Sequence, residues 1–212
     1  ERGIRLHAGH AVVDIHRARR EVRAADGTVA SYDRLLLATG SNPFILPIPG
    51  NDLPGVIGFR DIKDVETMLA AARTGKNAVV IGGGLLGLEA ANGLMKQGMQ
   101  VTVVHVLDTL MERQLDPVAA DMLRANLEER GLRFLMGAQT AALLGEERVR
   151  AVRFKDGLEI PTDLVVMAVG IRPNFELAKQ IGIYCERGIV VNDTMQTYDP
   201  RVYAVGECVQ HR

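Results

Sequence analysis

The residues best able to do chemistry in this 212-residue sequence are three glycines with the spacing Gly82-x-Gly84-x-x-Gly87. They follow the apolar stretch Ala78–Ile81, which predicts a buried strand, and they precede a helical pattern. In such a turn the first glycine permits a sharp bend, the second lets the backbone approach a pyrophosphate, and the third lets the helix pack on the strand. The helix N-terminus then offers N–H groups and a partial positive charge to phosphates. The motif therefore predicts a binding site for NAD(P)H, and a glycine-rich turn that binds nothing is the alternative.

The nicotinamide dinucleotide site is expected to extend beyond the glycines. We expect Leu85 and Leu86, in the first turn of the helix, to contact the dinucleotide. About 20 residues after the glycines, at the end of the next strand, an acid normally accepts hydrogen bonds from the ribose 2′-OH. Here that count reaches His105, and Asp108 would supply the acid only if the following loop folds back. The alternative for His105 is an exposed residue that contacts nothing.

Composition and charge exclude several classes of function. The 25 Lys and Arg residues and 26 Asp and Glu residues leave a formal net charge of −1, without the basic field of a nucleic-acid or anionic-membrane binder. The two cysteines, Cys185 and Cys208, form neither a CxxC pair nor a four-ligand metal site, and three histidines near the N-terminus do not share a strand face. No apolar run reaches 18 residues and no signal peptide is evident. We expect a cytoplasmic protein with no metal site, no nucleic-acid partner and no membrane contact.

The elements that position these residues alternate between strand and helix from residue 61 to residue 136, which predicts an α/β fold with a parallel sheet. We expect a Rossmann-like domain with helices on both faces of the sheet, extended by a β-meander around the turn Lys155–Gly157. Residues 4–31 predict short strands with a hairpin turn at Asp26-Gly27. That segment is rich in arginine, which indicates either a solvated face or a docking surface for an acidic partner. Four prolines in residues 41–54 predict a connector.

Two more apolar strands end in glycine, at Ala38-Thr39-Gly40 and Ala168-Val169-Gly170, and the sequence closes with Tyr203-Ala204-Val205-Gly206-Glu207. Together with the Gly82 motif, these segments resemble the pyridine nucleotide–disulfide oxidoreductase family of two-domain flavoproteins. The resemblance implies that Gly170 belongs to the NAD(P) site and that Glu89 lies near the nicotinamide ring, although a surface glutamate paired with a lysine is the alternative for Glu89. It also implies an FAD site, of which this sequence holds a remnant made of Ala38, Thr39, Gly40, Gly206 and Glu207.

Further segments narrow the resemblance to the large subunits of NAD(P)H-dependent nitrite reductases. These segments are Leu110-Met111-x-x-Gln114-Leu115-Asp116, Gly170–Asn174, Gly188–Asp193 and Gly206-Glu207-Cys208. The resemblance implies a segment that passes hydride from NAD(P)H to FAD in an assimilatory enzyme that reduces nitrite to ammonia. Sirohaem and an iron–sulfur cluster would lie in other parts of that enzyme. A ferredoxin or rubredoxin reductase is the alternative enzyme, and a protein whose NADH occupancy switches a partner surface is the non-enzyme alternative.

The resemblance also predicts the domain organisation. We expect residues 58–170 to form the NAD(P)-binding domain, and residues 1–57 and 171–212 to form a partial FAD-binding domain built from both ends of the chain. The βαβ unit that holds the ADP half of FAD in the family has no counterpart here, so we expect an internal fragment that binds FAD weakly or not at all and is inactive alone. Its expected partners are the dinucleotide, the rest of its own chain and a small subunit. No side chain is predicted to be catalytic, because the cofactors carry the chemistry.

The histidine at position 105 leads to a first prediction, that the protein discriminates weakly between NADH and NADPH. A neutral imidazole does not repel a 2′-phosphate, and it does not supply the charged hydrogen bond of an acid, which is worth about 1.5–3 kcal/mol. That energy corresponds to about one to two decades of affinity. Titrations of the protein with each dinucleotide should give dissociation constants within about a hundredfold of one another, and a larger preference for either would contradict the prediction.

Overall fold

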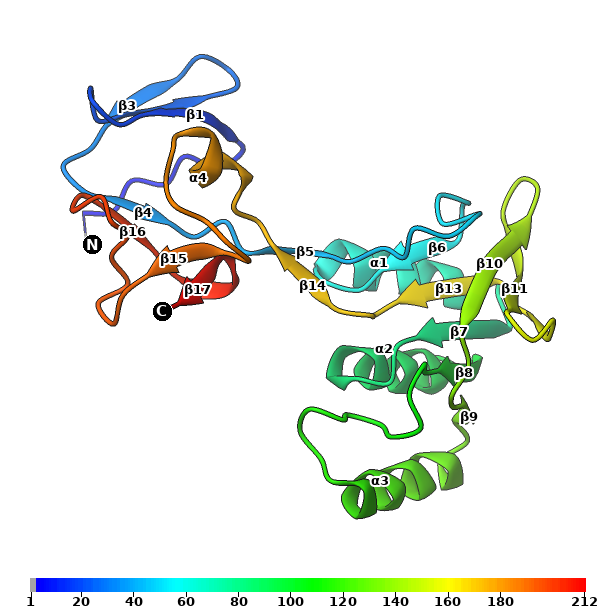
Figure 1. Cartoon of the computed structure of the whole chain (residues 1–212). Helices are drawn as coiled ribbons and strands as arrows, with labels where there is room; N and C mark the ends of the chain where they lie inside the picture. Colours follow the sequence, from blue (N-terminus) through cyan, green and yellow to red (C-terminus); the bar gives the residue numbers. More distant parts are fainter. Residues whose placement is uncertain (1–2) are drawn as a thin grey trace. The chain divides into compact units, whose positions relative to one another are not determined.

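The computed structural model describes residues 3–212, which form two compact units (Figure 1). The first unit contains the chain up to Asn42 together with Arg172–Arg212, and the second unit contains Pro43–Ile171. We expected the boundary between the two domains after residue 57, whereas the boundary between the two units lies after Asn42. Residues 43–57 belong to the second unit because Val56 pairs with its sheet and because apolar side chains of the proline-rich segment pack against its core. Which cofactor each unit binds stays a prediction.

The second unit is built on a parallel sheet of five strands. Its strands are β6 (Val56–Gly58), β13 (Leu164–Met167), β7 (Asn77–Ile81), β8 (Gln100–Val104) and β9 (Arg133–Leu135), hydrogen-bonded in that order. The three central strands are rich in valine and are almost fully buried, which is typical of a sheet covered on both faces. The expected parallel α/β sheet is therefore confirmed.

Successive residues of the central strand β7 point into two different cores. Ala78 and Val80 pack with the helices α1 (Ile62–Ala72), α2 (Leu85–Lys96) and α3 (Pro117–Glu129). Val79 and Ile81 pack instead against an antiparallel meander of β10 (Thr140–Gly145), β11 (Val149–Phe154) and β12 (Glu159–Pro161). The expectation of helices on both faces is wrong for the described residues, because apolar side chains of β10 and β11 cover the second face.

Local sequence signals account for where the helices begin. Asp61 caps α1 by accepting hydrogen bonds from the backbone N–H groups of Lys63 and Asp64, and Asp116 caps α3 by accepting one from Ala119. Helix α2 differs, because its N-cap is Gly84 and no side chain caps it. Within residues 3–212, no helix has the length and apolar character needed to cross a membrane.

The first unit consists of short strands around a smaller core. Strands β1 (Val12–His16), β2 (Glu21–Ala24) and β3 (Val29–Ser31) form the expected antiparallel hairpin structure. Its remaining elements are β4 (Leu35–Leu37) paired in parallel with β16 (Val202–Ala204), β15 (Ile189–Val191) paired with β17 (Val209–His211), α4 (Glu176–Gln180) and a 3₁₀ turn at Gly206–Cys208. Strands β5 (Ser41–Pro43) and β14 (Ile171–Pro173) pair where the chain passes between the units. Strand β4 is apolar throughout but is buried on one face only, since Leu36 is 58% exposed while Leu37 is 5% exposed.

Three arginines of the hairpin make ion pairs within the first unit. The Arg17 guanidinium donates to Asp199 Oδ2 at 2.8 Å, to the Tyr198 hydroxyl and to the carbonyl oxygen of Ile181, which ties the hairpin to the C-terminal part of the chain. Arg19 pairs with Glu21, and Arg20 lies 3.5 Å from Asp33. These contacts give the arginine-rich segment a structural role, and a docking role stays a hypothesis.

The carboxylate of Asp163 fixes the start of β13 against the start of β7. Its Oδ2 accepts hydrogen bonds from the backbone N–H groups of Lys76 at 2.8 Å and Asn77 at 3.0 Å. These two hydrogen bonds lower the pKa of the Asp163 carboxyl below its ordinary value. The ionised form therefore stabilises the junction of two central strands.

Replacing Asp163 with alanine should lower the free energy of unfolding at pH 7 by about 1.5–3 kcal/mol, because two backbone donors lose a charged acceptor. That stabilisation is present above the unfolded-state pKa of about 3.9. It is lost as the pH falls through the lower folded-state pKa, so the difference between wild type and variant should shrink in acid. Urea titrations at several pH values measure this. The matched control is Asp121→Ala at an exposed site on α3, which should change stability by less than about 0.5 kcal/mol.

Candidate functional site

The turn between β7 and α2 is glycine-rich for two different reasons, of which the first is packing within the protein. A Cβ on Gly82 would fall on the carbonyl oxygen of Ala168, and Gly82 has the left-handed φ of +123°. A Cβ on Gly87 would fall on the carbonyl oxygen of Gly82. Backbone therefore meets backbone where β7, α2 and β13 come together, and both positions need glycine for the fold itself.

Gly84 is glycine for the second reason. A Cβ built on Gly84 meets nothing within 4 Å, and its φ of −84° suits any residue. Because Gly84 is the uncapped N-cap of α2, the N–H groups of the first helical turn face outward without a side-chain acceptor. The protein therefore leaves the space above this helix N-terminus open. Such a space fits an anion that approaches the backbone closely, such as a pyrophosphate.

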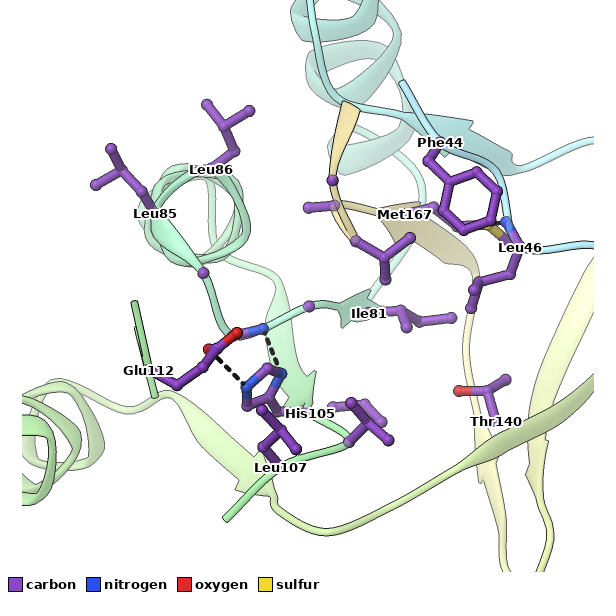
Figure 2. Close-up of a pocket in the computed structure, with 18 of the residues that line it drawn as sticks. Phe44, Leu46, Ile81, Leu85, Leu86, His105, Leu107, Glu112, Thr140 and Met167 are labelled. Atoms are coloured by element: carbon purple, nitrogen blue, oxygen red, sulfur yellow. Dashed lines mark hydrogen bonds and ion pairs between the residues drawn. The ribbon is translucent and has the colours of Figure 1, made fainter. Parts of the chain in front are cut away.

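A pocket of about 670 Å³ opens at this turn (Figure 2). That volume lies in the range of ligand-binding clefts. Its lining includes six residues that the sequence predicts for NAD(P)H: Gly82, Gly84, Leu85, Leu86, His105 and Gly170. Gly87 is buried beneath the turn and Glu89 is exposed on α2, and neither lines the pocket. The structure thus brings most of the predicted set together around one cavity, and the part that each residue plays in binding stays a prediction.

His105 lies at the end of β8, under the glycine turn, and is 8% exposed. Its Nδ1 accepts a hydrogen bond from the backbone N–H of Gly83 at 3.1 Å, and its Nε2 lies 3.4 Å from Glu112 Oε2 (Figure 2). The interpretation of His105 as an exposed residue without contacts is therefore wrong. Glu112 lines the pocket together with the cations Arg113 and Lys155, so both signs of charge border it.

Several pocket residues have no signal in the sequence. Phe44 and Leu46 come from the proline-rich segment that we expected to be only a connector, yet they line the pocket opposite Leu85 and Leu86 (Figure 2). Glu112 follows His105 by seven positions in an irregular loop, where neither helical nor strand periodicity applies. These residues reach the pocket through tertiary packing, which local patterns do not encode.

The predicted FAD residues come together in the first unit. Strands β4 and β16 are parallel neighbours, so Ala38-Thr39-Gly40 and Gly206-Glu207 follow them at the same edge. The Ser41 hydroxyl donates to Glu207 Oε2 at 2.9 Å, which joins the two segments. Gly40 and Gly206 have φ values of +66° and +79°, and a Cβ on either meets nothing within 4 Å. Two open glycine turns side by side fit a cofactor that lies against the backbone, as FAD would.

The two cysteines differ in their surroundings. Cys208 is fully buried in the core of the first unit, as expected for a small apolar residue. Burial raises the pKa of the Cys185 thiol, which keeps the thiol protonated at neutral pH. The surroundings of Cys185 therefore disfavour a reactive thiolate.

The glycine geometry predicts that two alanine substitutions in the same turn have opposite signatures. Gly84→Ala should change the free energy of unfolding by less than about 1 kcal/mol, because the methyl group enters open space. It should weaken NADH binding at least about tenfold, because that methyl group separates the backbone from the pyrophosphate. Gly87→Ala should lower stability by about 1–3 kcal/mol, because backbone atoms must move. Urea unfolding and NADH titration of both variants measure this, and a Gly84→Ala variant that binds NADH like wild type would contradict it.

Comparisons with known proteins agree with this geometry. The model of the pyridine nucleotide–disulphide oxidoreductase family matches residues 1–212. Two proteins of Bacillus subtilis (strain 168) are similar: "Nitrite reductase [NAD(P)H]" is 54% identical over the whole chain and 26% of its own length, and "Assimilatory nitrate reductase electron transfer subunit" is 47% identical over 99% of the chain and 27% of its own length.

Among solved structures, a ferredoxin reductase from Rhodopseudomonas palustris superposes with a TM-score of 0.90 at 33% identity, covering 94% of this chain and 50% of that one. The chain thus spans about a quarter of the two relatives and half of the solved structure. The match of the family model over the full sequence, the parallel sheet and the glycine turn agree with one another, and the chain belongs to the pyridine nucleotide–disulphide oxidoreductase family of NAD(P)H-dependent flavoproteins.

Proposed function

We propose that the second unit binds NAD(P)H with the pyrophosphate on the N-terminus of α2, as the hydride-input segment of a flavoprotein reductase. The observation that carries the proposal is Gly84, the one glycine of the turn whose missing side chain the protein's own packing does not require. The uncapped first turn of α2 supplies donors for the phosphates, and Leu85, Leu86 and Phe44 supply apolar walls. Gly170 follows β13 and lines the same pocket, where it offers backbone without a side chain to a bound ring.

The chemistry of this proposal belongs to the cofactors, with NAD(P)H giving a hydride and FAD accepting it. The chain's own residues bind and orient. Gly40 and Gly206 offer open backbone in the first unit, and the Ser41–Glu207 hydrogen bond holds their two segments together. The proposal requires no side-chain nucleophile or general base of either unit.

The wider activity that we propose is the reduction of nitrite to ammonia in a longer protein, with sirohaem and an iron–sulfur cluster outside residues 1–212. Its support is the similarity to the nitrite reductase of Bacillus subtilis, together with the sequence segments of residues 110–116 and 206–208. A ferredoxin reductase is the second candidate, supported by the structural similarity to the Rhodopseudomonas palustris enzyme. The rest of the chain and a small subunit are the proposed partners, and a cytoplasmic location is proposed from the cysteine usage.

The visible spectrum of the longer protein tests the nitrite proposal. We expect flavin and sirohaem bands that NADH bleaches and that nitrite restores, because electrons enter through the flavin and leave at the sirohaem. NADH without nitrite, and nitrite without NADH, are the matched controls. A flavin spectrum that NADH bleaches but nitrite leaves unchanged would reject nitrite as the acceptor and favour the ferredoxin-reductase class.

The 212-residue chain itself should retain little FAD, since only the remnant residues in the first unit are available to hold it. Gel filtration after incubation with excess FAD, followed by an absorbance spectrum, measures the bound flavin. We expect less than about one flavin per ten chains after the column. This order-of-magnitude figure assumes that the affinity for FAD is at least about tenfold too weak for the complex to survive gel filtration. Recovery of about one flavin per chain would contradict the expectation of weak FAD binding.

A further inference from the structure

Residues outside the glycine turn form hydrogen bonds with both the N–H and the carbonyl oxygen of Gly83. The Gly83 N–H donates to His105 Nδ1 at 3.1 Å, and the Gly83 carbonyl oxygen accepts from the Met111 N–H at 3.0 Å. Both partners belong to the loop of residues 105–116, between β8 and α3. The turn that meets the pyrophosphate is therefore clamped at both hydrogen-bonding groups of its middle glycine.

The clamp is tightly packed. A Cβ on Gly83 would lie 2.6 Å from Leu110 Cδ2 and 2.8 Å from His105 Cγ, and Leu110 is 1% exposed. Met111 has a left-handed φ of +49°, which a non-glycine residue adopts only where its surroundings require it. The loop thus rests on Gly83 without room for a side chain, and it holds Met111 in a conformation that aims its N–H at the Gly83 carbonyl.

The contact with Gly83 determines the proton position on His105. A backbone N–H can only donate, so Nδ1 must be the unprotonated nitrogen that accepts. The proton of the neutral ring then lies on Nε2, which faces Glu112 Oε2 at 3.4 Å. Both nitrogens of the imidazole face groups of the protein, which leaves neither free to take the place of the acid that reads the ribose.

We propose that His105 is a positioning residue for the phosphate-binding turn, which acts on NAD(P)H through the Gly83 peptide. By holding the Gly83 N–H, the imidazole keeps the turn in the conformation in which Gly84 and the first turn of α2 face the pyrophosphate. Without this acceptor, the turn spreads over other conformations, and the apparent affinity falls with the fraction that remains competent. The inference rests on the proposed binding of NAD(P)H and deepens it.

Two amide substitutions separate the two nitrogens of the ring. In His105→Asn, the side-chain oxygen can occupy the position of Nδ1 and still accept from Gly83. In His105→Gln, the longer amide reaches the position of Nε2 and leaves the Gly83 N–H without its acceptor. We expect His105→Gln to raise the dissociation constant for NADH about tenfold, and His105→Asn to stay within about threefold of wild type.

The outcomes of this titration are distinguishable. Rescue by asparagine together with loss by glutamine supports the proposal, because a general packing defect would affect both variants alike. Equal affinities for the two variants, whether both normal or both weakened, would overturn it. If wild type does not bind NADH, the proposed function itself fails, and the inference about binding falls with it.

A measurement on the wild-type protein covers the case in which a variant does not fold. NMR of protein carrying ¹⁵N-labelled histidine distinguishes a protonated ring nitrogen from an unprotonated one. For His105 we expect the proton on Nε2 and a bare Nδ1 coupled to the Gly83 amide proton. A proton on Nδ1 at neutral pH would overturn the proposal without reference to any binding experiment.

Discussion

The second unit depends on one steric constraint, the contact of backbone with backbone where β7 turns into α2. Gly87 lies over the carbonyl oxygen of Gly82, and Gly82 lies against the carbonyl oxygen of Ala168 at the end of β13. No side chain can enter either contact, so the start of the helix sits as close to the sheet as the main chain allows. This closeness aims the first turn of α2 into the pocket and fixes the face of the sheet on which α2 packs.

The four glycines of this turn look equivalent in the sequence, but each is needed for a different contact or for none. Gly82 and Gly87 serve the contact of strand and helix, and Gly83 serves the loop of residues 105–116. Gly84 serves none of these contacts and is the position left open to a ligand. A glycine motif therefore combines requirements of folding with requirements of binding, and only the distances around each Cβ tell them apart.

The features that could be predicted from the sequence are those with a local cause. The apolar strand β7, the capped helices α1 and α3, and the hairpin turn at Asp26-Gly27 each follow from neighbouring residues. The continuous apolar run of β7 indicates two buried faces but does not say what covers each, and the meander rather than helices covers one of them. Phe44 and Glu112 reach the pocket only through tertiary packing. The burial of His105 could not be predicted either, because its hydrogen-bond partner is a backbone group that no side-chain pattern reveals.

Both candidate sites consist mainly of backbone groups rather than of reactive side chains. Such groups suit the binding of a cofactor more than a chemical step of their own. In the proposed function, open glycines and helix N–H groups bind a dinucleotide, and one imidazole holds a peptide group of the turn, without any side chain reacting with the dinucleotide. In the proposed function, such a site does not depend on the identity of the electron acceptor, because the hydride enters before electrons reach that acceptor. The loop of residues 105–116 lines the pocket, and its residues 110–116 carry part of the nitrite reductase resemblance. This resemblance and the clamp on the glycine turn therefore coincide in one segment of the chain.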